Sequence, residues 1–157
     1  MKSIKLESNS SIDTIKIAQK LAGVLSKGDL VILTGELGAG KTKFTEGFLS
    51  FYKIEDEISS PTFNIVNEYT SNGTNIYHFD VYRLTDSDEF YAIGGEEYFD
   101  KGICLIEWGE IIKDVLPNEY LEIKMVKEIN NENKRILYLT AIGKKYEHLL
   151  DLFNENL

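Results

Sequence analysis

The sequence predicts an α/β domain: a three-layer sandwich in which a mixed, mainly parallel central sheet carries helices on both faces. Short apolar runs typical of buried strands alternate with segments whose apolar residues recur every three or four positions, as on one face of a helix. Two pairs of runs are joined by turn residues, which indicates hairpins beside the parallel strands. No repeat or linker interrupts residues 1–157, so we expect a single domain.

The elements follow in order along the chain. Ser10 or Ser11 can cap the first helix, and Gly28 lies beyond its end. The first half is expected to hold a helix over 12–25, a strand over 30–33, a helix over 41–52, and strands over 63–69 and 75–82 turned at 71–74. The second half is expected to hold short helices in 86–100 interrupted at 94–95, a strand over 103–106, a short helix ending near 116, strands at 121–125 and 137–139 turned at 130–133, and a helix over 146–153.

Composition excludes several classes of protein. With 17 basic and 26 acidic side chains, the formal charge of −9 argues against a protein that grips a nucleic-acid backbone by itself. The single cysteine, Cys104, excludes an internal disulfide framework and a cysteine-rich zinc site. No apolar stretch is long enough to cross a membrane, and residues 1–11 lack the apolar core of a signal peptide. We therefore expect a cytoplasmic protein with no membrane contact.

One motif carries the chemistry. Residues 35–42, Gly-Glu-Leu-Gly-Ala-Gly-Lys-Thr, match G-x-x-x-x-G-K-[ST] in full, between a predicted strand and a predicted helix. Glycines at 35, 38 and 40 allow positive φ and bring backbone N–H groups against phosphate oxygens. The helix that opens at Lys41 points its positive dipole end at the same anion. Lys41 is expected to bridge the outer phosphates and Thr42 to bind Mg²⁺, as in P-loop NTPases.

A P-loop site also needs an acid at the end of a neighbouring strand, to hold Mg²⁺ or a water bound to it. Glu107 follows a purely apolar run, which favours it as the Mg²⁺ ligand. This leaves Asp80 to orient water or a group that contacts the Mg²⁺ ligands. For either acid alone, a solvated strand end is the alternative. Thr62, behind Pro61, is placed to reach Mg²⁺ when a γ-phosphate is present, although a plain turn residue is an equal reading.

The remaining candidate site residues also have ordinary structural interpretations. Arg83 and Arg135 are the only arginines, and a surface ion pair is the favoured interpretation of each. His78 is expected to be a hydrogen-bonded core residue. Trp108, directly after Glu107, is a candidate wall of the site or a partner contact, and simple packing is the favoured interpretation.

The motifs together resemble the TsaE (YjeE) family of bacterial ATPases. The resemblance rests on 35–42, on Ser60-Pro61-Thr62-Phe63, on the segment His78-Phe79-Asp80-Val81-Tyr82-Arg83 and on Ile106-Glu107-Trp108, in this order. It covers nearly the whole chain, more weakly in the last third, and Glu36 stands where the family often has aspartate.

The resemblance implies a role in forming threonylcarbamoyladenosine at position 37 of tRNAs that read ANN codons. It implies a protein that hydrolyses ATP slowly by itself and acts within a complex with the subunits TsaB and TsaD. The tRNA would be contacted indirectly, through that complex. By this resemblance Leu37, Gly38, Ala39, Gly40, Lys41, Thr42 and Lys43 would hold the phosphates of ATP. Thr42 and Glu107 would bind Mg²⁺, Asp80 would serve hydrolysis, and 60–63 would sense the nucleotide. The base would lie near Ser10 and Ser11, with Arg135 on its other side.

We expect a switch in which ATP and Mg²⁺ order the Thr62 loop, the ordered form docks on the partners, and hydrolysis weakens the contact. Three rivals stay open. A small-molecule kinase would need an acceptor pocket and more arginines. A GTPase would need an Asn-Lys-x-Asp segment, which the sequence lacks. A nucleotide-gated adaptor would hydrolyse ATP only incidentally.

Overall fold

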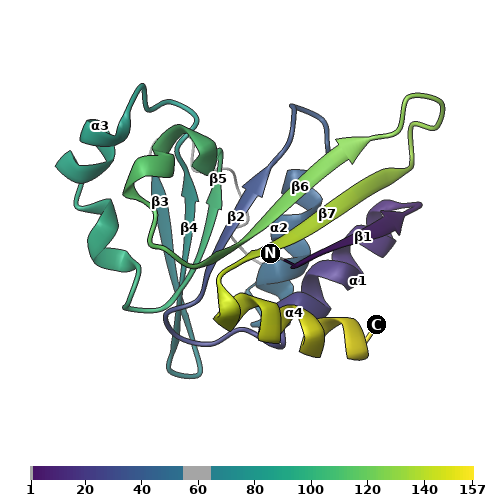
Figure 1. The fold of residues 1–157 in the computed structure, drawn as a ribbon, viewed down its shortest axis with the longest axis horizontal. Helices are drawn as coiled ribbons and strands as arrows, with labels where there is room; N and C mark the ends of the chain where they lie inside the picture. Colours follow the sequence, from purple (N-terminus) through teal and green to yellow (C-terminus); the bar gives the residue numbers. More distant parts are fainter. Residues whose placement is uncertain (1, 55–64) are drawn as a thin grey trace.

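The centre of the molecule is one mixed sheet. The computed structural model describes residues 2–54 and 65–157, and within them seven strands pair in the order β1-β7-β6-β2-β5-β4-β3 (Figure 1). The four central strands β6, β2, β5 and β4 run parallel, while β1, β7 and β3 pair antiparallel at the two sides. The strands are β1 (Lys2–Ser8), β2 (Leu30–Thr34), β3 (Val66–Ser71), β4 (Thr74–Asp80), β5 (Ile103–Glu107), β6 (Tyr120–Lys127) and β7 (Arg135–Ile142).

Helices cover both faces of this sheet, which confirms the predicted three-layer α/β fold. One face packs against α1 (Ser11–Ala22), α2 (Lys41–Phe51) and α4 (Lys144–Glu155). The other face packs against α3 (Ser87–Ala92) and the 3-10 turns η1 (Gly95–Tyr98) and η2 (Gly109–Val115). Strands β2 and β5 are buried along their whole length, because alternate residues face opposite layers. In β2, Val31 and Leu33 join the first core, and Leu30 and Ile32 join the second.

The helix that leaves the P-loop lies close against α1. A Cβ placed on Gly47 of α2 would lie 2.6 Å from the backbone oxygen of Ile15 in α1, so only glycine permits this approach. At the start of α1, the Ser10 side chain accepts a hydrogen bond from the Asp13 N–H at 3.1 Å, which makes Ser10 the N-cap. The prediction left this choice open between Ser10 and Ser11.

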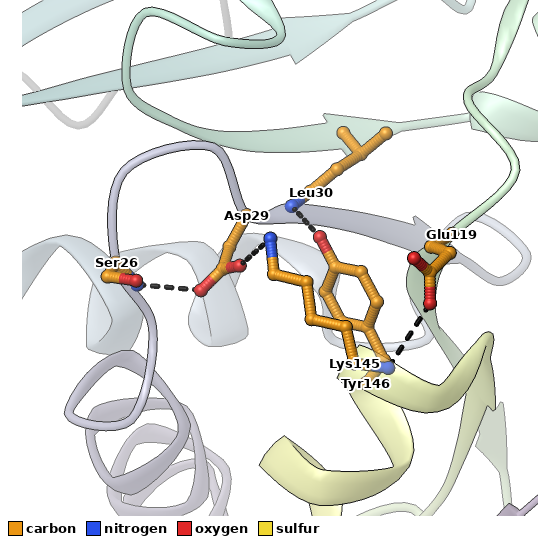
Figure 2. Close-up of polar contacts among 6 residues, drawn as sticks. All are labelled: Ser26, Asp29, Leu30, Glu119, Lys145 and Tyr146. Carbon is orange, nitrogen blue, oxygen red and sulfur yellow. Dashed lines mark hydrogen bonds and ion pairs between the residues drawn. The ribbon is translucent and has the colours of Figure 1, made fainter.

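The end of the sheet where β2 begins is closed by α4 (Figure 2). The buried Asp29 carboxylate accepts a hydrogen bond from the Ser26 N–H at 2.7 Å, and Lys145 Nζ lies 2.8 Å from its other oxygen. Tyr146 reaches the same place: the Leu30 N–H donates to its hydroxyl at 2.8 Å. The second and third residues of α4, Lys145 and Tyr146, thus pair with polar groups where β2 begins.

Most predicted elements are present, with some shifts. The predicted turn at 71–74 is confirmed, because Asn72 and Gly73 take the positive φ values (49° and 80°) that a tight hairpin requires. The third strand begins at Val66, and positions 63 and 64 of its predicted range lie outside the described residues. Strand β1 was not predicted. In residues 2–54 and 65–157, no helix is long and apolar enough to cross a membrane.

Candidate functional site

The P-loop has the backbone that its glycines are needed for. It connects the buried strand β2 to helix α2, and φ is +149° at Gly35, +84° at Gly38 and +103° at Gly40. All three values lie in the region that side chains other than glycine rarely adopt. At Gly35 there is also no space, since a Cβ would lie 2.7 Å from the Met125 carbonyl oxygen in β6. The neighbouring strand therefore sets the position of the loop.

Lys41 begins α2 and is largely buried, with 7% of its surface exposed. Its Nζ donates a hydrogen bond to the Gly35 carbonyl at 2.7 Å and lies 3.7 Å from the centre of the Trp108 ring. Burial lowers the pKa of Lys41, and the nearby carboxylates of Glu107, Glu110 and Asp80 oppose that shift. The ammonium is thus held by a carbonyl and an aromatic face, close to three acids.

Two acids end neighbouring parallel strands beside this lysine. Asp80 ends β4 and Glu107 ends β5, and the two residues are direct partners in the β4–β5 register. Asp80 accepts a hydrogen bond from the Tyr82 N–H at 3.1 Å. Glu107 is 8% exposed, and one of its oxygens lies 2.6 Å from Nε2 of the buried His78. The structure therefore brings together Lys41, Asp80 and Glu107, as the sequence predicts.

Trp108 forms a wall of the site. Its backbone adopts φ = +64°, an uncommon value for a residue with a side chain, and its N–H donates to the Leu33 carbonyl at 3.2 Å. This turn directs the chain out of β5 directly after Glu107 and places the indole against Lys41. The Tyr82 ring lies beside it, with 5.9 Å between ring centres. Strained residues of this kind cluster at functional sites. The contact with Lys41 supports a site wall over the simple packing that the sequence favoured for Trp108.

A cavity of about 480 Å³ opens along the P-loop between β6 and Trp108. Burial raises the pKa of Glu110 at its edge, and the residue's own backbone hydrogen bond and Lys41 oppose that rise. The described residues that line the cavity are Thr34, Gly35, Glu36, Leu37, Ala39, Trp108, Glu110, Lys124, Met125, Val126 and Lys127. The residues predicted to flank the base, Ser10, Ser11 and Arg135, are not among them.

Arg135 instead contacts the P-loop from β7. Its guanidinium donates to the Gly38 carbonyl at 3.3 Å and to the Lys134 carbonyl at 3.1 Å, and its Nε is buried without a hydrogen-bond partner among the described residues. Arg135 also pairs with Ser8 in the β1–β7 register, two residues before the Ser10 cap of α1. The start of α1 therefore lies on the P-loop side of the molecule. That these residues bind a base stays a prediction.

The other predicted site residues differ in their surroundings. Thr42 is exposed in the first turn of α2, and Leu37 is 85% exposed at the tip of the P-loop. Lys43 pairs with Glu46 at 3.1 Å, one turn further along α2. Thr62, with the whole segment Ser60–Phe63, lies outside the described residues.

The sequence interpretation did not assign a site role to His78. The sequence feature that indicates such a role is the two-residue spacing between His78 and Asp80, which places both side chains on one face of β4. Once β4 is known to lie beside β5, that face includes Glu107 as well.

Comparison with known proteins decides the family. The family described as Threonylcarbamoyl adenosine biosynthesis protein TsaE matches residues 8–136, which include the P-loop, Asp80, Glu107 and Glu110. The chain belongs to the TsaE family. The resemblance seen in the sequence motifs is thereby confirmed.

Individual TsaE relatives match over most of their length. The tRNA threonylcarbamoyladenosine biosynthesis protein TsaE of Bacillus subtilis is 40% identical over 152 residues, covering 96% of this chain and 94% of that protein. The protein of the same name from Haemophilus influenzae is 36% identical over 136 residues, covering 83% and 86%. The crystal structure of Bacillus subtilis YdiB superposes with a TM-score of 0.84 at 34% identity, over 99% of this chain and 96% of that one. The P-loop NTPase-like fold is thus shared along the whole chain.

Proposed function

We propose that this chain is a Mg²⁺-dependent ATPase subunit required to form threonylcarbamoyladenosine at position 37 of tRNAs that read ANN codons. It acts as a nucleotide switch on a TsaB/TsaD transferase complex in the cytoplasm. One observation carries the proposal: a P-loop lysine, Lys41, lies beside two carboxylates at the ends of neighbouring parallel strands, in a chain of the TsaE family. A role on a complex also suits the charge of −9, because tRNA would then be held mainly by the partners.

The residues at the P-loop suit a hard divalent cation. Mg²⁺ prefers a few oxygen ligands together with substrate phosphates and does not need a cage of side chains. Thr42 offers an exposed hydroxyl in the first turn of α2, and Glu107 offers a carboxylate whose second oxygen receives no hydrogen bond from residues 2–54 or 65–157. When bound, the cation neutralises charge on the phosphate oxygens.

The chain's own groups supply the remaining steps. Backbone N–H groups of Leu37 to Lys43 would hold the phosphates, while Lys41 would exchange its contacts with Gly35 and Trp108 for phosphate oxygens. Asp80, at the end of β4, would orient the attacking water. Ser10, Ser11 and Arg135 would flank the base, and Thr62 would respond to the γ-phosphate.

The deciding experiment measures phosphate release from ATP by the purified chain with Mg²⁺ and with EDTA, alone and with TsaB and TsaD. The proposal requires weak hydrolysis that depends on Mg²⁺ and rises strongly with the partners. Equal affinity for the partners with ATP and with ADP would exclude the switch. Phosphate transfer to a small molecule in place of release would favour a kinase. An Asp80→Ala chain that binds ATP, docks and supports tRNA modification would favour an adaptor.

A further inference from the structure

His78 is a polar side chain placed where packing alone would favour an apolar one. It lies in the middle of β4, opposite Leu105 of β5, and only 2% of it is exposed. Its strand neighbours Tyr77 and Phe79 belong to the core on the other face of the sheet. A buried polar group is unfavourable unless it is hydrogen-bonded, so the contacts of this imidazole show what it contributes.

The imidazole makes one hydrogen bond among the described residues, and that bond is to Glu107. His78 Nε2 lies 2.6 Å from Glu107 Oε2, and an ionised carboxylate only accepts, so Nε2 carries the donated proton. The other ring nitrogen, Nδ1, is buried and has no partner in residues 2–54 and 65–157. A buried nitrogen without a partner lowers the free energy of unfolding. Stability alone therefore does not explain a histidine here.

The hydrogen bond fixes the direction of the Glu107 carboxylate. The last torsion of a glutamate side chain is broad, so a carboxylate at a strand end is free to rotate unless something holds one oxygen. With Oε2 held by His78, the second oxygen is left for another ligand, on the sheet face that also carries Asp80. Side chains that hold a metal ligand in this way commonly set the affinity of the site for its metal.

We propose that His78 is a positioning residue that holds the Glu107 carboxylate in the orientation in which it binds a divalent cation beside the nucleotide. This inference rests on the proposed function, since it assumes a cation at Glu107. His78 contacts neither nucleotide nor cation and acts only through Glu107.

The test measures binding of Mn²⁺, used as a spectroscopic substitute for Mg²⁺, to the full chain with ADP, by electron paramagnetic resonance. His78→Phe keeps the ring volume and removes the donor, and His78→Gln places an amide donor near the position of Nε2. We expect His78→Phe to weaken Mn²⁺ binding by about 10-fold to 100-fold and His78→Gln to restore most of it. ADP affinity in EDTA should not change. Tyr77→Phe, on the opposite face of the same strand, is the matched control.

A double-mutant cycle with Glu107→Gln separates positioning from a general effect on structure. If His78 acts through Glu107, His78→Phe has no further effect on Mn²⁺ binding once Glu107 is replaced. An equal loss in both backgrounds, or unchanged Mn²⁺ binding in a folded His78→Phe chain, overturns the inference. Wild-type protein that binds ADP without any contribution from Mn²⁺ or Mg²⁺ overturns the proposed Mg²⁺ dependence first, and the inference with it.

A second measurement needs no substitution at His78. The chain has two histidines, His78 and His148, and His148 is exposed on α4. Adding Mg²⁺ to the ADP-bound protein should move the ring ¹⁵N resonances of His78 and leave those of His148 in place. Glu107→Gln should abolish the response. A His78 spectrum that ignores Mg²⁺ while the cation binds would contradict the inference.

Discussion

The central strands carry a buried carboxylate at each end, and the two are used differently. Asp29, before β2, has a partner for each oxygen, the Ser26 N–H and Lys145 Nζ (Figure 2). Glu107, at the end of β5, has His78 on one oxygen and no described hydrogen bond to the other. The same chemical group therefore closes the fold at one end and stays available to a ligand at the other.

The lysines beside these carboxylates sharpen the contrast. Lys145 pairs directly with Asp29 and keeps 47% of its side chain exposed. Lys41 is 7% exposed and contacts a carbonyl and the Trp108 ring, while its acids lie nearby. An ammonium with such contacts can move to a phosphate without leaving a buried carboxylate unpaired. The difference predicts that substitutions at the two ends affect different properties of the protein.

The largest effect is expected from Lys41→Ala. Under the proposed function Lys41 donates to the outer phosphates, so its removal should weaken ATP binding by about 3 kcal/mol, a factor on the order of 100, because hydrogen bonds to charged groups are strong. The chain should remain folded. Lys145→Ala is the matched change at the other end, and it should leave ATP affinity intact while lowering the free energy of unfolding by about 1 kcal/mol, a value reduced by solvent exposure. Calorimetric titration with ATP and urea unfolding of both chains measure the two properties.

The next effect compares the carboxylates themselves. Under the proposed function Glu107 binds the cation, so Glu107→Gln should reduce Mg²⁺-dependent hydrolysis by roughly 100-fold and should not lower stability. Asp29→Asn should lower the free energy of unfolding by about 1–3 kcal/mol, because the ion pair with Lys145 is lost, and leave hydrolysis unchanged. Steady-state phosphate release and urea unfolding test both. If Asp29→Asn also abolished hydrolysis in folded protein, the two ends would not be independent.

The sequence predicts those parts of the fold and of the candidate site that depend on residues close together in the chain. The run Leu30 to Leu33 and the P-loop after it are contiguous, so the strand, the turn and the helix start can each be recognised from their own residues. Asp80 and Glu107 were found for the same reason, as acids that follow strands. The edge strand β1 was missed because its alternate residues Lys5 and Glu7 are exposed and its pairing with β7 is distant in sequence.

Contacts between distant segments required the structure. The role of His78 depends on β4 lying beside β5, and that of Tyr146 depends on α4 closing the start of β2. Nothing near either residue in the sequence indicates its partner. Hydrophobic periodicity places Tyr146 on the buried side of a helix but does not show that its hydroxyl accepts from a strand N–H 116 residues away.

A smaller effect is expected from Tyr146→Phe at the Asp29 end. The Leu30 N–H is buried and donates to the Tyr146 hydroxyl, so losing that oxygen should lower the free energy of unfolding by about 1–2 kcal/mol. Urea unfolding measures it, with Tyr138→Phe on the exposed side of β7 as the control. ATP binding should be unaffected. A stability equal to wild type would show that water replaces the hydroxyl.

The smallest effect is a gain in stability at the P-loop end. Burial lowers the pKa of Lys41, which means that the folded protein holds this proton less tightly than the unfolded chain does. At neutral pH the charged lysine is therefore unfavourable in the nucleotide-free protein, and this cost fades as pH rises toward the ordinary value of 10.5. Lys41→Met should then melt slightly above wild type at pH 7, and the difference should shrink by pH 9.5. Lys16→Met, exposed on α1, corrects for the loss of one positive charge from an acidic chain. A Lys41→Met chain that melts below Lys16→Met at pH 7 would mean that the contacts of Lys41 with Gly35 and Trp108 outweigh the cost of burying its charge. The lysine at the P-loop end would then stabilise the fold, as Lys145 does at the Asp29 end.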